Sequence, residues 1–246
     1  MVEMYKKLII SGDIVELYEY EKLNINGAKF DYENRRDKGE GEQVRSDENY
    51  RQTAKRRGEL VRRLINSNFK ASNSKFITLT FGRNEGIDVC NVKECNCQYK
   101  KFIQRLKRRY EGVKYVTVIE FQKRGAVHYH MICDLPYVKK KDLSDLWGLG
   151  FVKINKIEHV DNVGAYVSKY MTKELADERL RGLKGYNCSK NLDRPIELKT
   201  WIDGEQVVAD VCEMYIKEKN PVYSAKYTGD KIGQVGYVQF NLSKRD

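Results

Sequence analysis

The chain has 246 residues, of which 41% are hydrophobic and 33% charged, and its formal net charge is +11 at pH 7. Its length suits one large domain, or one domain with appendages, and its basic balance indicates a polyanionic partner, nucleic acid first. No apolar run approaches the ~20 residues of a membrane span and no signal peptide is evident, so we expect a cytoplasmic protein without a membrane partner.

The first predicted element is a hairpin over residues 6–22. Two apolar runs flank Ser11-Gly12-Asp13, a tripeptide typical of turns. Residues 24–48 are polar, charged and glycine-containing, which predicts a loop or linker. We therefore expect residues 1–48 to form an N-terminal hairpin and linker.

Two basic amphipathic helices are predicted, over residues 50–66 and 99–110, on either side of a strand at residues 76–81. In the first helix, Glu59 is the only acid between Arg51 and Arg63. A solvated helix face has a similar pattern, but this shortage of acids favours contact with phosphates. The side chains that we expect to contact nucleic-acid phosphates are Arg56, Arg57, Arg105 and Arg108.

Residues 115–133 predict two strands joined by a tight turn near Arg124. His128 and His130 alternate on the second strand, so both imidazoles point to one face. With this turn, Glu120 lies opposite His128 on the neighbouring strand. A His-x-His pair is often only a surface pair, but two of the chain's three histidines lie here with a carboxylate in register. The pattern indicates a divalent-metal site with open coordination positions.

A short helix over residues 139–147 and a strand over residues 151–154 follow, and Asp161 or Asn162 suits the N-cap of a helix over residues 163–176. One stripe of that helix carries Tyr166, Lys169, Tyr170 and Lys173, at spacings i, i+3, i+4 and i+7. Burial of two unpaired lysines is costly. The stripe therefore indicates a phosphodiester site rather than core.

The remainder of the chain carries weaker signals. Residues 186–195 predict a loop, residues 207–219 a helix and residues 221–242 a hairpin. No P-loop pattern is present, so we expect no built-in ATPase or helicase. The six cysteines are expected to be reduced thiols, and because the closely spaced Cys90, Cys95 and Cys97 lack an evident fourth ligand, we do not predict zinc there.

Three of these motifs, in this order, resemble those of the HUH endonucleases. The threonine-containing strand at residues 76–81 resembles the first family motif, and His128-Tyr129-His130 with upstream Glu120 resembles the second. Tyr166-x-x-Lys169, repeated as Tyr170-x-x-Lys173, resembles the third, in the doubled form of two-tyrosine rolling-circle initiators of small single-stranded-DNA phages and related plasmids. The resemblance covers about residues 50–174.

The resemblance implies an α+β fold, a central antiparallel sheet of about five strands flanked by helices, of the ferredoxin/RRM-like type. The order of predicted strands and helices fits this class. We expect the HUH domain at residues 49–185 and a C-terminal extension, residues 186–246, packed on it.

The activity implied is sequence-specific, metal-dependent nicking and rejoining of single-stranded origin DNA through a 5′-phosphotyrosine, which leaves a 3′-OH primer. Tyr166 and Tyr170 would be nucleophiles assisted by Lys169 and Lys173, and the Glu120, His128 and His130 side chains would hold Mg²⁺ or Mn²⁺. A host helicase and DNA polymerase are the expected partners, in the host cytoplasm if a phage encodes the chain.

Three alternatives stay open. The first is a relaxase or single-strand transposase of the same superfamily, although Glu120 stands where mobilisation proteins commonly carry a third histidine. The second is a zinc hydrolase, which leaves the Tyr/Lys stripe unexplained. The third is a non-catalytic DNA-binding protein, such as an autorepressor.

Overall fold

The computed structural model describes residues 5–23, 47–82, 86–157, 162–171, 177–229 and 232–244. The chain forms two compact units. The central unit is Glu48–Arg194, and the terminal unit combines the residues up to Asp47 with those from Pro195 on. Each unit holds one five-stranded antiparallel sheet with helices, which confirms the predicted α+β class.

The sheet of the central unit places the histidine strand in its middle. In spatial order the strands are β6 (Val152–Lys156), β3 (Lys75–Thr80), β5 (Val127–Cys133), β4 (Tyr115–Phe121) and β7 (Tyr186–Cys188). Every neighbouring pair is antiparallel. Strand β5 is therefore held by hydrogen bonds on both edges, which fixes the positions of its side chains.

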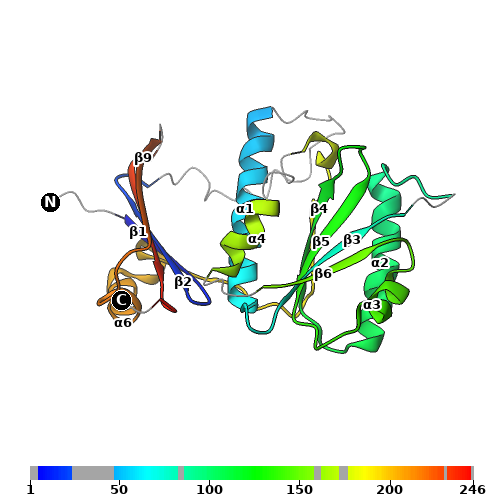
Figure 1. The fold of residues 1–246 in the computed structure, drawn as a ribbon. Helices are drawn as coiled ribbons and strands as arrows, with labels where there is room; N and C mark the ends of the chain where they lie inside the picture. Colours follow the sequence, from blue (N-terminus) through cyan, green and yellow to red (C-terminus); the bar gives the residue numbers. More distant parts are fainter. Residues whose placement is uncertain are drawn as a thin grey trace, which may run out of the picture. The chain divides into compact units, whose positions relative to one another are not determined.

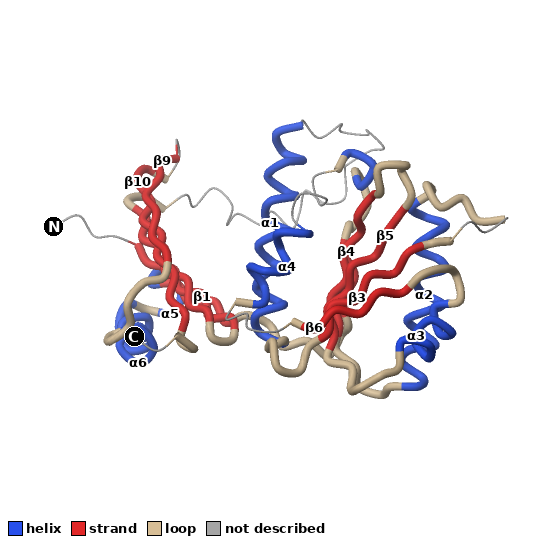
Figure 2. The backbone as a smooth tube through the Cα atoms, viewed as in Figure 1, coloured by secondary structure: helices blue, strands red, loops and turns tan. Residues whose placement is uncertain are grey.

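Two layers of helices cover the two faces of this sheet (Figures 1 and 2). Helices α2 (Val92–Arg109) and α3 (Lys140–Trp147) pack on one face, where Leu106, Trp147 and Tyr129 lie in the larger core cluster. Helices α1 (Asp47–Asn68) and α4 (Val163–Met171) pack on the other face. Because strand residues alternate between faces, the even-numbered residues of β3, β4 and β5 face α1 and α4.

The terminal unit is a second sheet that the sequence did not predict as a whole. Its spatial order is β8 (Ile196–Lys199), β1 (Tyr5–Ser11), β2 (Ile14–Tyr20), β10 (Gly233–Asn241) and β9 (Tyr223–Gly229). Helix α6 (Glu205–Ile216) buries Val208 against Leu8, Val15 and Phe240, and the short α5 (Thr200–Asp203) precedes it. Both predicted hairpins and the predicted helix are confirmed, and the two hairpins join through β2 and β10.

Two predictions about local structure were wrong. Residues 186–188 form β7 rather than a loop, because they pair with Val116–Val118 of β4. The second basic helix begins at Val92 rather than near residue 99, since the Asn91 side chain caps it by accepting from the backbone N–H groups of Lys93 and Glu94.

Some predictions lie outside the described residues, namely the linker at residues 24–46, Asp161 and the helix end at residues 172–176. Among the helices that are described, none is long and apolar enough to cross a membrane.

Candidate metal centre and nucleic-acid site

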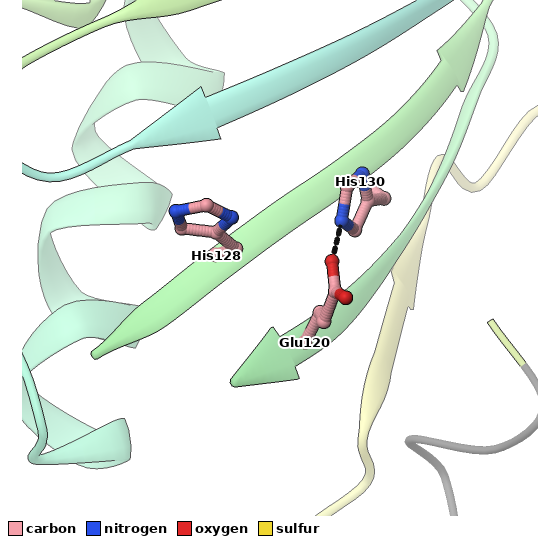
Figure 3. Close-up of side chains that lie close together, drawn as sticks. All are labelled: Glu120, His128 and His130. Atoms are coloured by element: carbon pink, nitrogen blue, oxygen red, sulfur yellow. Dashed lines mark hydrogen bonds and ion pairs between the residues drawn. The ribbon is translucent and has the colours of Figure 1, made fainter. Parts of the chain in front are cut away.

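The central hairpin brings Glu120, His128 and His130 together as the sequence predicted. Glu120 lies directly opposite His128 in the β4–β5 ladder. One potential ligand atom from each of the three side chains lies within 4.8 Å of the others (Figure 3). Among the described residues, these form the only group of three or more histidine, cysteine or acidic side chains that could share a metal ion.

Neighbouring side chains hold the ring of His130 in place. Its Nδ1 lies 3.1 Å from the Thr78 hydroxyl, and its Nε2 contacts a carboxylate oxygen of Glu120. The Phe76 ring stacks on the imidazole, with centroids 5.5 Å apart. Thr78 is directly opposite His130 in the β3–β5 ladder, so the threonine of the first motif supports a histidine of the second. Bonds of this kind to one ring nitrogen orient a histidine whose other nitrogen binds a metal.

His128 has the properties of a neutral ligand. Its Nε2 is buried and has no hydrogen-bond partner within the described part of the chain. Burial lowers the pKa of His128, the neighbouring His130 and Arg124 lower it further, and Glu120 opposes them. Burial thus favours the neutral form of the His128 ring, and a neutral imidazole beside a second imidazole and a carboxylate is a donor set that fits a divalent cation.

Tyr166 lies on α4, the helix that packs over the same sheet face as the three potential ligands. The side chain of Asn162 caps α4 by accepting from the N–H of Ala165 at 2.8 Å, as predicted. The Tyr166 ring is partly buried against the cluster that contains Phe76 and Val118. The face therefore combines a phenol with the carboxylate and both imidazoles.

The other residues of the predicted Tyr/Lys stripe are described less fully. The backbone of Lys169 and Tyr170 continues α4, but their side chains lie outside the described part of the structure. Lys173 lies wholly outside it. Their catalytic roles stay predictions.

Residues 74–175 match the family model of replication-associated protein ORF2. This stretch lies within the central unit and includes Glu120, His128, His130 and Tyr166. The match is consistent with a replication initiator that interacts with DNA. No curated protein and no solved structure matches the chain.

The four predicted phosphate contacts divide between the two sheet faces. Arg56 and Arg57 lie on α1, which covers the face of the three potential ligands. Arg105 and Arg108 lie on α2, which covers the opposite face. The α1 arginines are therefore better placed for a nucleic acid that reaches the ligands.

The guanidinium of Arg105 also has a structural partner. It donates to the carbonyl oxygens of Leu146 and Trp147, at 2.9 and 3.2 Å, and so caps the C-terminus of α3. Arg57 donates to the carbonyl of Leu183 at 3.1 Å, while Arg56 and Arg108 are exposed. Sequence periodicity gave no signal for the partners of Arg105 and Arg57, because Leu146 and Leu183 are distant in the chain.

The cysteines give no second metal site among the described residues. Cys90 and Cys97 are exposed, whereas Cys95 is buried and its thiol points at the carbonyls of Asp88 and Val89. Burial raises the pKa of the Cys95 thiol to about 12, so it remains protonated and is a poor metal ligand at neutral pH.

Proposed function

We propose that the chain initiates rolling-circle replication by nicking and rejoining single-stranded origin DNA. The observation that carries this proposal is the shared sheet face: Glu120, His128 and His130 converge on it, and α4 carries Tyr166 over it. The family match over this stretch and the basic character of the chain support the same choice.

Cleavage would be an in-line transfer to the phenol. The Tyr166 oxygen forms a bond to phosphorus while the bond from phosphorus to the 3′ oxygen breaks. The phenol loses its proton, and the leaving 3′ oxygen gains one. The products are a 5′-phosphotyrosine and a free 3′-OH, and the reverse attack by a 3′-OH rejoins the strand.

The chain's own residues supply two requirements of this step. A free phenol has a pKa near ~10 and is a poor nucleophile at pH 7. An ammonium group from Lys169 or Lys173 would favour the phenolate by its charge. Glu120, His128 and His130 would hold Mg²⁺ or Mn²⁺, which when bound polarises a non-bridging phosphate oxygen.

The second tyrosine would end a round of replication. Tyr170 follows Tyr166 by four residues, about one helical turn. It would cut the regenerated origin while Tyr166 still holds the original 5′ end. In this assignment Tyr166 makes the first cut, since it heads the first Tyr-x-x-Lys.

Mass spectrometry of the covalent adduct formed with single-stranded DNA tests the proposal. Wild-type protein with Mn²⁺ should yield a peptide linked to DNA through Tyr166, and chelation should abolish the adduct. Tyr166→Phe should lose most initiation, whereas Tyr170→Phe should still nick but fail to release closed circles. An adduct on Tyr170 alone would reverse the order of the two tyrosines.

Variants of the histidines separate catalysis from binding. His128→Ala and His130→Ala should abolish the adduct while single-stranded DNA binding largely persists, because binding rests on basic side chains. Binding without any adduct from wild-type protein would instead favour a non-catalytic DNA-binding protein.

A further inference from the structure

A group of cations lies beside the candidate metal centre, along the β7 edge of the sheet. It consists of Arg57 on α1 and of Arg181 and Lys184 in the segment that leads into β7. We call these three residues the cation strip. None of the motifs in the sequence includes Arg181 or Lys184.

Strand β7 brings this segment next to Glu120. Tyr186 pairs with Val118, two residues before Glu120 on β4 and on the same face. The pairing continues beyond β7, because the Ile119 N–H donates to the Gly185 carbonyl at 3.3 Å. The segment from Lys184 to Tyr186 therefore runs alongside the end of β4 that holds Glu120.

Two of the cations each lie over an aromatic ring. The Lys184 ammonium is 4.6 Å from the centroid of the Tyr186 ring, and the Arg181 guanidinium carbon is 5.0 Å from that of Tyr50. The Tyr50 hydroxyl is itself fixed, donating to the Asp177 carbonyl at 2.5 Å. The contact with Tyr186 restricts the Lys184 ammonium without neutralising its charge.

Arg57 connects the two pairs. Its guanidinium donates to the carbonyl of Leu183, next to Lys184, and its charge acts on both Tyr50 and Tyr186. Burial raises the pKa of both phenols, so they carry no negative charge at neutral pH. Lys184 and Arg57 form no ion pair with an acidic side chain of the described residues. The positive charges of Lys184 and Arg57 are thus left for another partner.

We propose that Arg57, Arg181 and Lys184 bind successive phosphates of a single-stranded DNA segment that lies across the β7 edge of the candidate metal centre. The proposal rests on the proposed function for its DNA ligand and adds the path of the strand. Basic side chains that follow the phosphate backbone, with aromatic rings among them, are typical of sequence-tolerant binding to single strands. The net charge of the central unit fits this ligand, with 31 lysines and arginines against 16 acids over residues 48–194.

Salt titration of DNA binding tests the strip. The probe is a fluorescent oligothymidylate, bound to the full chain and followed by anisotropy. The slope of log K against log salt is negative, and each lost phosphate contact should make it less steep by about 0.7. Lys184→Gln and Arg181→Gln should each produce this shift and weaker binding. Lys101→Gln, an equal change at an exposed cation of α2 on the opposite sheet face, should leave the slope unchanged.

The outcomes separate the two proposals. The variants of the cation strip could show the same salt dependence of binding as wild type while wild type still forms the covalent adduct. In that case the proposed role of the strip is wrong and the proposed function stands. If wild type does not bind the oligothymidylate, the proposed role of the cation strip falls, and the covalent adduct decides the proposed function separately. Equal weakening by Lys101→Gln would also overturn the proposed role of the cation strip, because it would indicate that any exposed cation contributes equally. Should Arg181→Gln lose its fold by circular dichroism, Lys184→Gln decides.

Discussion

Thr78 and His130 form the contact by which one strand orients a ligand on its neighbour. The Thr78 hydroxyl lies 3.1 Å from His130 Nδ1. Thr78→Val keeps the shape of the side chain but removes this hydrogen bond. We expect it to lower affinity for Mn²⁺ by about 10–100-fold, as loss of such supporting bonds typically does. Titration calorimetry with Mn²⁺ measures the change.

Thr80→Val is the matched control for that experiment. Thr80 pairs with His128 in the same ladder, but the buried Nε2 of that ring accepts no hydrogen bond from it. The affinity of the Thr80→Val protein for Mn²⁺ should therefore stay close to that of wild type. Thr78→Ser keeps a hydroxyl at this position, so that variant should retain most of the affinity. Identical losses from both valine variants would show that the Thr78 hydroxyl has no special role.

Arg105 is expected to stabilise the fold rather than bind DNA. Its two hydrogen bonds to carbonyls at the end of α3 involve a charged donor, for which a loss of about 2 kcal/mol is typical. Arg105→Ala should lower the free energy of unfolding by this order, measured by urea denaturation. The exposed Arg108→Ala should change stability little. An unchanged urea midpoint for Arg105→Ala would contradict the structural role.

At the scale of elements, the crossing of α1 and α4 depends on a glycine. The Gly164 N–H donates to the Asn66 side chain at 2.7 Å, and a Cβ at residue 164 would lie 2.5 Å from the Arg62 carbonyl oxygen. Gly164→Ala should force the helices apart and cost roughly 1–3 kcal/mol. Because α4 carries Tyr166, nicking should fall as well.

Thermal unfolding of Gly164→Ala beside Gly236→Ala checks this packing argument. A Cβ at residue 236 would make only ordinary contacts, 3.6 Å or more from the Glu19 side chain. That variant should unfold near the wild-type temperature. A Gly164→Ala protein of wild-type stability would mean that the two helices separate at no cost.

Elements fixed by local signals could be predicted from the sequence. The Glu120–His128 register follows from the length of one turn, and the helices follow from their apolar periodicity and caps. Strand β7 has three residues and depends on pairing with β4, more than sixty residues earlier. Non-local pairing of this kind gives a short strand no local pattern. The same reason explains why the cation strip was missed.

At the scale of the whole molecule, the grouping of distant segments was the least predictable feature. Strand β2 pairs with β10 over more than two hundred residues, which unites the predicted N-terminal hairpin and C-terminal extension in one sheet. Each hairpin has a local turn signal, but the pairing between them leaves no mark in either sequence. Only the central unit carries motifs that indicate chemistry.

The two units also differ in charge, and this leads to a prediction about DNA binding. Residues 48–194 have 31 basic and 16 acidic side chains, whereas the rest of the chain has 15 and 19. Phosphate contacts release condensed counterions, so affinity should fall steeply with salt, and the central unit should account for that dependence. Arg56→Gln on α1 should therefore weaken binding of oligothymidylate and make the dependence of log K on log salt less steep. Lys226→Gln on β9, also an exposed cation, should leave both unchanged. A larger effect from Lys226→Gln would place the DNA on the terminal unit.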